Sequence, residues 1–136
     1  MVNGFRFSKR SKEKLKEAEP LLRELMTRAI MTSNSDFSVI CGHRTEEEQN
    51  EAYRKGYSKL KYPRSKHNKI PSMAVDVVPY PLDWSDIASF KELAEHIKSV
   101  WSTMEYENAT GDWELVHGGD WKMRDYPHWE LRKKKQ

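Results

Sequence analysis

Apolar residues recur at helical spacing in the first quarter of the chain. Between Ser11 and Thr32 they follow a period of about 3.6 residues, which predicts an amphipathic helix with one face on a core. Pro20 lies inside this stretch and has no backbone N–H to donate. The helix is therefore expected either to kink at Pro20 or to begin again with Pro20 in its first turn.

Capping signals mark two further helices. Thr45, followed three residues later by Glu48, forms a capping box and predicts a helix over residues 46–55 that stops at the next glycine. A longer amphipathic stretch follows in the second half of the chain, with Asp83 or Ser85 as its capping residue. Three helices are therefore expected.

Short apolar runs bounded by turn residues predict the strands. They lie at Asp36–Cys41, Ala74–Val78, Trp113–His117 and Pro127–Leu131. With the helices they indicate an α+β fold, a single small domain over residues 1–136 whose short antiparallel sheet is covered by about three helices. The basic residues 132–136 are expected to form a flexible tail.

The composition excludes several classes of protein. Hydrophobic residues make up 37% of the chain, and five Trp, six Tyr and four Phe favour a packed domain over a disordered one. The 24 Lys and Arg nearly balance the 21 Asp and Glu, and no stripe of cations interleaved with aromatic residues is recognised, so a nucleic-acid binder is not expected. No apolar run is long enough for a signal peptide or a membrane span.

The count of metal-binding side chains is more informative. One cysteine and five histidines exclude a disulfide framework and a Cys-rich zinc finger, which leaves histidine and carboxylate as the expected ligands of a transition metal. Cys41 ends an apolar strand and is expected in the core. His43 lies in a turn and His96 on the polar side of its helix, so neither is expected in a site.

Two unusual groups of residues suggest a site. Asp76 interrupts an apolar strand, where a carboxylate is costly to bury unless it is paired or binds a metal, and His67 lies nine residues upstream. Near the C-terminus, Asp125, His128 and Glu130 lie among aromatic residues. Two histidines and one aspartate with an open fourth position are the ligand pattern of a catalytic zinc ion, and a spare carboxylate is the base that such a site needs.

Each of these residues also has an ordinary explanation. Asp76 could belong to a buried salt bridge, and His67 could be a solvated loop residue. Ion pairs with neighbouring arginines would account for Asp125 and Glu130. His117 alternates with apolar residues and is a reserve ligand. The spacing of these residues leaves the alternatives open.

Three short motifs resemble the SxH, AxD and DxxHxE signature of the D-alanyl-D-alanine carboxypeptidase and L-alanyl-D-glutamate endopeptidase family of zinc peptidases. In this chain they are Ser65-Lys-His67, Ala74-Val-Asp76 and Asp125-x-x-His128-x-Glu130. The likeness covers nearly the whole chain, and the segments DFSVICGHRTEEEQ, VDVVPYPLDW and GGDW are similar to the phage endolysin branch. It implies a Hedgehog/D-Ala-D-Ala peptidase-like fold. The step from the first histidine to the aspartate is two residues longer than is common in that family.

The resemblance also implies roles for the motif residues. One catalytic Zn²⁺ would be held by His67, Asp76 and His128, and Asp125 would act as general base. Arg44 matches a family arginine that binds or polarises the substrate carbonyl.

Three further positions match family residues around this centre. Ser65 and Gln49 would lie at the substrate together with Arg44. Glu130 would hold one of the zinc ligands in orientation.

The expected function is therefore that of a peptidoglycan-degrading zinc metallopeptidase, a phage endolysin that hydrolyses the L-alanyl-D-glutamate bond of the stem peptide. Such a protein is expected to be a monomer with no nucleic-acid partner and no stable membrane association. Without a signal peptide, it would be made in the host cytoplasm and would reach the periplasm and cell wall after the membrane is permeabilised.

Three other functions remain open from the sequence. A D-Ala-D-Ala carboxypeptidase would use the same chemistry on another bond. A zinc-stabilised wall-binding module would have lost catalysis, although a free base beside the second histidine argues against that. A metal-dependent nuclease would suit the basic pI of about 8.9 but not the even balance of charge.

Overall fold

The computed structural model describes residues 4–135. Its helices are α1 (Lys9–Lys16), α2 (Pro20–Thr32), α3 (Glu46–Arg54) and α4 (Ile87–Tyr106), with short 3₁₀ turns η1 (Lys66–Asn68) and η2 (Gly118–Asp120). Its strands are β1 (Phe37–Cys41), β2 (Ala74–Pro79), β3 (Trp113–His117) and β4 (His128–Lys133). The strands form one antiparallel sheet in the order β1-β2-β4-β3. The predicted α+β fold and its antiparallel sheet are confirmed, with four α-helices among the described residues instead of three.

The first helical stretch is divided in two at its proline. α1 ends at Lys16, and α2 begins with Pro20 at its first position, where the missing N–H has no intrahelical partner to lose. The Glu19 side chain accepts a hydrogen bond from the Leu21 N–H, 2.8 Å away, and caps the new helix. Of the two alternatives, the restart at Pro20 is therefore the one that the chain adopts.

Side chains at the helix starts define where α3 and α4 begin. Thr45 and Glu48 form the predicted capping box of α3. The cap of α4 is Asp86, so the expectation of Asp83 or Ser85 is wrong. Asp83 instead accepts hydrogen bonds from the backbone and side chain of Ser85, which closes a turn ahead of the helix.

The last strand runs further than expected. Arg132 and Lys133 pair with Glu114 and Trp113 of β3, so the prediction that a flexible tail begins at residue 132 is wrong. Lys133 also lies over the Trp113 ring, with Nζ 4.4 Å from the ring centroid. Of the predicted tail, Gln136 lies outside the described residues.

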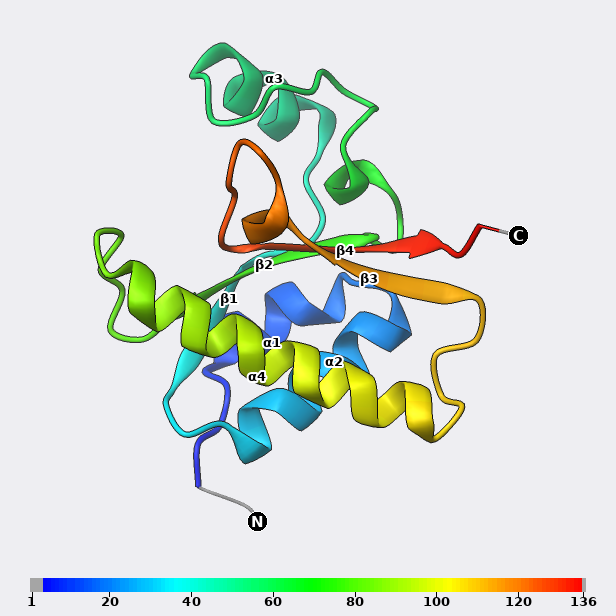
Figure 1. The fold of residues 1–136 in the computed structure, drawn as a ribbon. Coiled ribbons are helices and arrows are strands. Elements are labelled where there is room, and N and C mark those ends of the chain that lie inside the picture. The colour runs from blue at the N-terminus through cyan, green and yellow to red at the C-terminus, as the bar shows by residue number, and fades with distance from the viewer. Residues whose placement is uncertain (1–3, 136) are drawn as a thin grey trace.

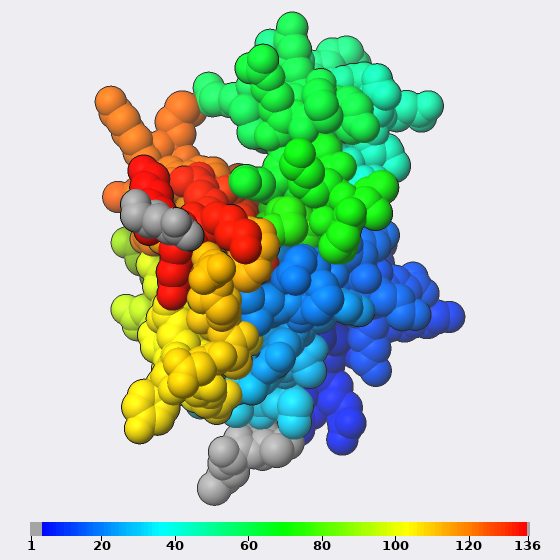
Figure 2. All heavy atoms as spheres, turned by 90° about the vertical axis from the view of Figure 1, so that its right-hand side faces the viewer, coloured from blue at the N-terminus to red at the C-terminus, as the bar shows by residue number. Residues whose placement is uncertain are grey.

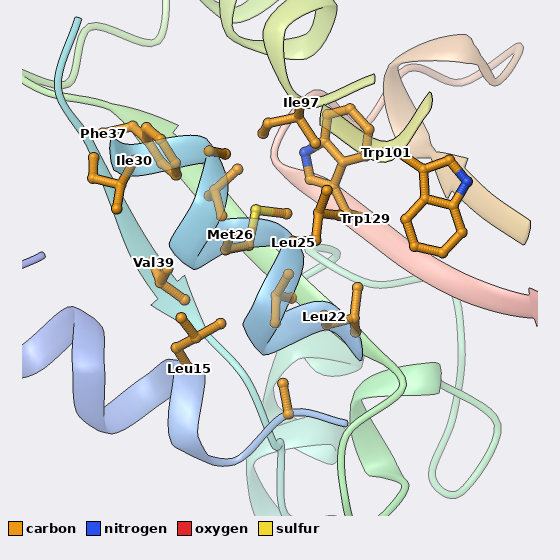
Figure 3. Packing of buried hydrophobic residues seen from close by; sticks show 14 of the residues in the cluster. Leu15, Leu22, Leu25, Met26, Ile30, Phe37, Val39, Ile97, Trp101 and Trp129 are labelled. Atoms are coloured by element: carbon orange, nitrogen blue, oxygen red, sulfur yellow. The ribbon is translucent and has the colours of Figure 1, made fainter. Parts of the chain in front are cut away.

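Three helices cover one face of the sheet. In Figure 1, α1, α2 and α4 lie below the sheet, whereas α3 and the loop after it lie above it. The core fills the space between these three helices and the sheet. Figure 3 shows Leu25 and Met26 of α2 in this core, with Val39 of β1 on one side and Ile97 of α4 on the other. None of the described helices has the length and apolar character needed to cross a membrane.

Alternation along the central strands separates core from site. On β2, Val75 and Val77 belong to the core, so Asp76 between them points to the opposite face. On β4, Trp129 belongs to the core and the preceding His128 points away from it. Asp76 and His128 are cross-strand partners, so the face not covered by α1, α2 and α4 carries both.

Candidate metal centre

Two histidine rings converge on the Asp76 carboxylate. His67 Nε2 lies 3.2 Å and His128 Nδ1 lies 3.4 Å from the same oxygen, Asp76 Oδ1. The two histidine rings meet edge to face, with centroids 5.1 Å apart. The His67 side chain is 2% exposed and that of Asp76 is 17% exposed, so the cluster is buried except on the side of its carboxylate. Three of the predicted site residues are therefore brought together from η1, β2 and β4.

Local capping positions the first histidine. Ser65 is buried, and its hydroxyl accepts a hydrogen bond from the His67 N–H at 3.2 Å, which starts the 3₁₀ turn η1. His67 Nδ1 lies 2.8 Å from the Gly42 carbonyl oxygen, which can only accept. The ring therefore donates from Nδ1 and turns Nε2 toward Asp76.

Burial and opposite charge act together on this pair. Burial disfavours a charged imidazole, but the adjacent Asp76 carboxylate outweighs it and raises the pKa of His67 to about 10. Burial also disfavours the Asp76 carboxylate, yet His67 and His128 hold its pKa well below its usual range. A buried carboxylate between two imidazoles thus needs positive charge, which either protons or a cation can supply.

The second histidine is held from behind by an acid. His128 Nε2 lies 2.7 Å from Glu130 Oε1, and Glu130 Oε2 accepts a hydrogen bond from Arg132 Nε at 2.7 Å. Glu130 is buried, which raises its pKa, but His128 and Arg132 lower it more. Glu130, which the sequence pattern placed beside an expected metal ligand, therefore orients the His128 ring. The other ring nitrogen, Nδ1, is turned toward Asp76.

Asp125 lies on the loop before β4, at the rim of the cluster. Its backbone N–H donates to the Gly118 carbonyl at 2.9 Å, and its own carbonyl accepts from the His128 N–H at 3.2 Å. Partial burial of its carboxylate and the negative charge of Asp76 raise the pKa of Asp125. A carboxyl with a raised pKa beside a buried cluster is suited to accept and return a proton.

The loop that carries Asp125 packs on a glycine. A Cβ atom on Gly118 would lie 2.4 Å from the Asp125 carbonyl oxygen and 3.0 Å from the Cβ atoms of Asp125 and His128. This close approach holds both residues against the end of β3. Gly118 was not singled out in the sequence, although the pair of glycines there marked the end of a strand.

Arg44 reaches the opposite side of Asp76. Its Nη2 lies 3.9 Å from Asp76 Oδ2, and its Nη1 donates to Gln49 Oε1 at 2.8 Å. Gln49 is fully buried, and its Nε2 donates to the Ser58 hydroxyl and the Leu60 carbonyl. Gln49, which was expected at the substrate, thus uses its amide inside the protein to hold the Arg44 guanidinium.

Asn68 completes this support and was missed in the sequence. Its Nδ2 donates to the Arg44 carbonyl at 3.0 Å and to Gln49 Oε1 at 3.2 Å, and its Oδ1 accepts from the Ser65 N–H. The same short turn thus fixes His67 and the segment that carries Arg44. Ser65, like Gln49, is buried in this support.

Cys41 also joins the cluster, so its expected place in the core is wrong. The register between β1 and β2 shifts after Val39, and the shift sets Cys41 opposite Asp76. Its Sγ lies 3.7 Å from His67 Nδ1. Cys41, His67 and Asp76 each offer a ligand atom within 4.8 Å of the others, and this group could hold a metal ion.

The remaining histidines lie outside the cluster. His117 pairs with Trp129 on the core face, stacks on its ring at 3.9 Å and bonds the Tyr126 carbonyl at 2.8 Å, so the reserve ligand is on the wrong side of the sheet. His96 is half-buried, with Nε2 2.9 Å from the Ala29 carbonyl oxygen of α2, and so is less exposed than expected. His43 contributes its backbone N–H to the Glu17 carboxylate.

Comparison with known proteins gives consistent matches over almost the whole chain. A model of the family described as phage L-alanyl-D-glutamate peptidase matches residues 3–135. The chain is 28% identical over 133 residues to the L-alanyl-D-glutamate peptidase of Escherichia phage T5, and the match covers 96% of this chain and 91% of that protein. It is also similar to the crystal structure of ChiX, an L-Ala D-Glu endopeptidase of Serratia marcescens, with a TM-score of 0.77, 28% identity and coverage of 95% and 92% of the two chains.

Proposed function

This chain belongs to the phage L-alanyl-D-glutamate peptidase family, and we propose that it is a zinc-dependent endopeptidase that cleaves the L-alanyl-D-glutamate bond of bacterial peptidoglycan. The observation that carries the proposal is the convergence of His67, Asp76 and His128, with Asp125 at its rim. Both relatives described above are named for this bond. The site of action that follows is the cell wall.

The donor set supports zinc held by His67 Nε2, Asp76 Oδ1 and His128 Nδ1. A tetrahedral zinc ion with bonds of about 2.0–2.1 Å separates its ligand atoms by about 3.3–3.4 Å. The distances from His67 Nε2 and His128 Nδ1 to Asp76 Oδ1, 3.2 and 3.4 Å, agree with that spacing. Because the Gly42 carbonyl occupies His67 Nδ1, the nitrogen that remains for a metal is Nε2, which faces Asp76 rather than Cys41. Cys41 therefore lies beside the proposed site and is not one of its three ligands.

Each residue around this centre has a separate task. When bound, the zinc ion would supply positive charge that polarises the scissile carbonyl and makes water more acidic. Asp125 takes a proton from the attacking water and returns it to the departing amine, for which its raised pKa is suited. The Arg44 guanidinium stabilises the negative charge that develops on the carbonyl oxygen.

The buried polar residues keep these groups in place. Gln49 and Ser65 act through Arg44 and His67, because both are buried and bonded within the protein. Glu130 holds His128 through its distal nitrogen. A metal ligand whose second nitrogen bonds a carboxylate is more basic and better oriented than one without it.

Two substitutions test the division between metal binding and proton transfer. Asp125→Asn is expected to retain zinc and lose about 10²–10⁴-fold in kcat, because the amide cannot accept the proton. His128→Ala is expected to lose zinc and activity together, since a ligand is removed. Metal content by mass spectrometry and hydrolysis of purified peptidoglycan measure both.

Asp120→Asn is the matched control for the base. Asp120 is an exposed acid on the neighbouring turn, where it pairs with Lys98 at 2.8 Å, so its loss is expected to leave kcat within about twofold of the wild type. An Asp125→Asn variant as active as this control would rule out Asp125 as the base.

Analysis of the products identifies the bond. Cleavage between L-alanine and D-glutamate frees stem peptides from the glycan and exposes a new amino group on glutamate. A D-Ala-D-Ala carboxypeptidase would release only alanine. A wall-binding module would sediment with the wall and release neither product.

A further inference from the structure

The cations of this chain are unevenly distributed, although their total is nearly balanced by acids. Between Glu51 and Asp76 the sequence holds seven Lys and Arg and no acidic residue. Residues 57–69, which we call the basic loop, follow α3 and include η1. They contain five of these cations: Lys59, Lys61, Arg64, Lys66 and Lys69. Tyr57 and Tyr62 are exposed in the same segment. The even overall charge therefore concealed a local stripe of cations and aromatic rings.

The cations of the basic loop have no acidic partner within the described residues. Glu51 of α3 pairs with Arg54 and Lys55, which lie before the loop. None of the loop's five cations forms an ion pair in the part of the chain that the structure describes. Lys61 packs over the Tyr53 ring, and Lys59, Arg64 and Lys69 are exposed. The loop is thus a surface of unneutralised positive charge.

The basic loop borders the metal centre. It includes η1, which carries His67, and the His67 carbonyl accepts a hydrogen bond from the Arg44 N–H at 2.8 Å. A chain spans at most about 3.6 Å per residue, so the Cα of Arg64 lies within about 11 Å of that of His67 and the Cα of Lys69 within about 7 Å. Figure 1 shows this segment beside α3, on the side of the sheet away from the helical core. Figure 2 shows this green segment, together with α3, at the upper end of the molecule.

The proposed substrate presents the complementary charge close to the scissile bond. Glutamate has two carboxyl groups, and a peptide that continues beyond it uses only one. A free carboxylate therefore lies within a few bonds of the scissile amide, on the side of the leaving amine. Carboxylates of the following residues would extend this negative charge along the bound peptide.

We propose that the basic loop binds the free carboxylates of the stem peptide on the glutamate side of the scissile bond and so favours charged over amidated peptides. This inference rests on the proposed function and adds a determinant of specificity to it. The interaction is between solvent-exposed charges, so it acts mainly on KM and weakens as ionic strength rises.

Two peptides and two triple variants test the proposal. Both peptides contain the L-alanyl-D-glutamate bond and continue beyond it, one with the free glutamate carboxylate and one with that carboxyl amidated. The loop variant carries Lys59→Gln, Arg64→Gln and Lys69→Gln. The control carries Lys9→Gln, Arg10→Gln and Lys12→Gln, which remove the same charge from α1.

The wild-type chain is expected to have a KM for the charged peptide about tenfold below that for the amidated peptide, from a few interactions of about two- to fivefold each. The loop variant is expected to lose this difference by raising KM for the charged peptide alone, with kcat little changed, and the control is expected to keep it. The proposal is wrong if the loop variant still has a lower KM for the charged peptide, or if its KM rises equally for both peptides. If the wild type cleaves the two peptides with equal KM, the proposal about the loop is wrong and the proposed function stands. If the wild type cleaves neither peptide, the proposed function and the proposal about the loop are both refuted.

Discussion

Replacing Gly118 by alanine should impair catalysis by displacing the loop that carries Asp125. The new Cβ would lie 2.4 Å from the Asp125 carbonyl oxygen, whereas ordinary contact begins at 3.4 Å, so the loop must move by about 1.0 Å (3.4 − 2.4). The same Cβ presses on the Cβ of His128 at 3.0 Å. A misplacement of about 1 Å at a catalytic centre costs on the order of 10²-fold in rate. We therefore expect kcat/KM of Gly118→Ala to fall about 100-fold.

The assay compares this variant with Gly111→Ala, which separates loss of activity from loss of stability. Gly111 has a φ of 56° and no atom within 4 Å of its added Cβ, so alanine there costs about 1–2 kcal/mol through backbone strain alone. Overpacking at Gly118 costs a similar amount, about 1–3 kcal/mol. Both variants should therefore lose comparable free energy of unfolding, measured by urea denaturation, and only Gly118→Ala should lose peptide hydrolysis. Equal kcat/KM for the two variants would refute the view that Gly118 positions Asp125 and His128.

Two further predictions concern the residues that support the site and the core. Glu130→Gln should weaken zinc binding by about 10–100-fold, because the His128 ring loses its charged partner. Competition with a chelator measures the affinity. The control is Glu114→Gln, which changes an exposed acid on β3. Burial lowers the pKa of His117 below its usual value, so the folded protein favours the neutral imidazole. The contribution of His117 to the free energy of unfolding is therefore present above about pH 6.5 and is lost as the pH falls. Thermal unfolding in a chelator between pH 7 and 5 should therefore depend less on pH in His117→Gln than in wild type, and an unchanged dependence would contradict this assignment.

Local signals in the sequence were sufficient for most of the helices and strands. The capping box of Thr45 and Glu48, and the restart of a helix at Pro20, depend on groups within four residues of one another. The types of residue in the site were equally visible, because a carboxylate between valines requires a partner wherever the strand lies. The cap of α4 was missed because Asp83 and Ser85 satisfy each other in a turn, which leaves Asp86 to receive the helix.

The sequence by itself therefore determined most of the elements, the α+β class and the chemical character of the site: histidines and carboxylates in three short motifs. The tertiary structure decided which side chains share a face. A shift in strand register moves Cys41 from the core to Asp76, and the pairing of β3 with β4 puts His117 on the core side. Register is set by contacts between distant segments, and one residue of shift reverses every side chain, so local periodicity does not specify it. The same holds for the basic loop, whose position beside Arg44 depends on how η1 packs against the segment that carries this arginine.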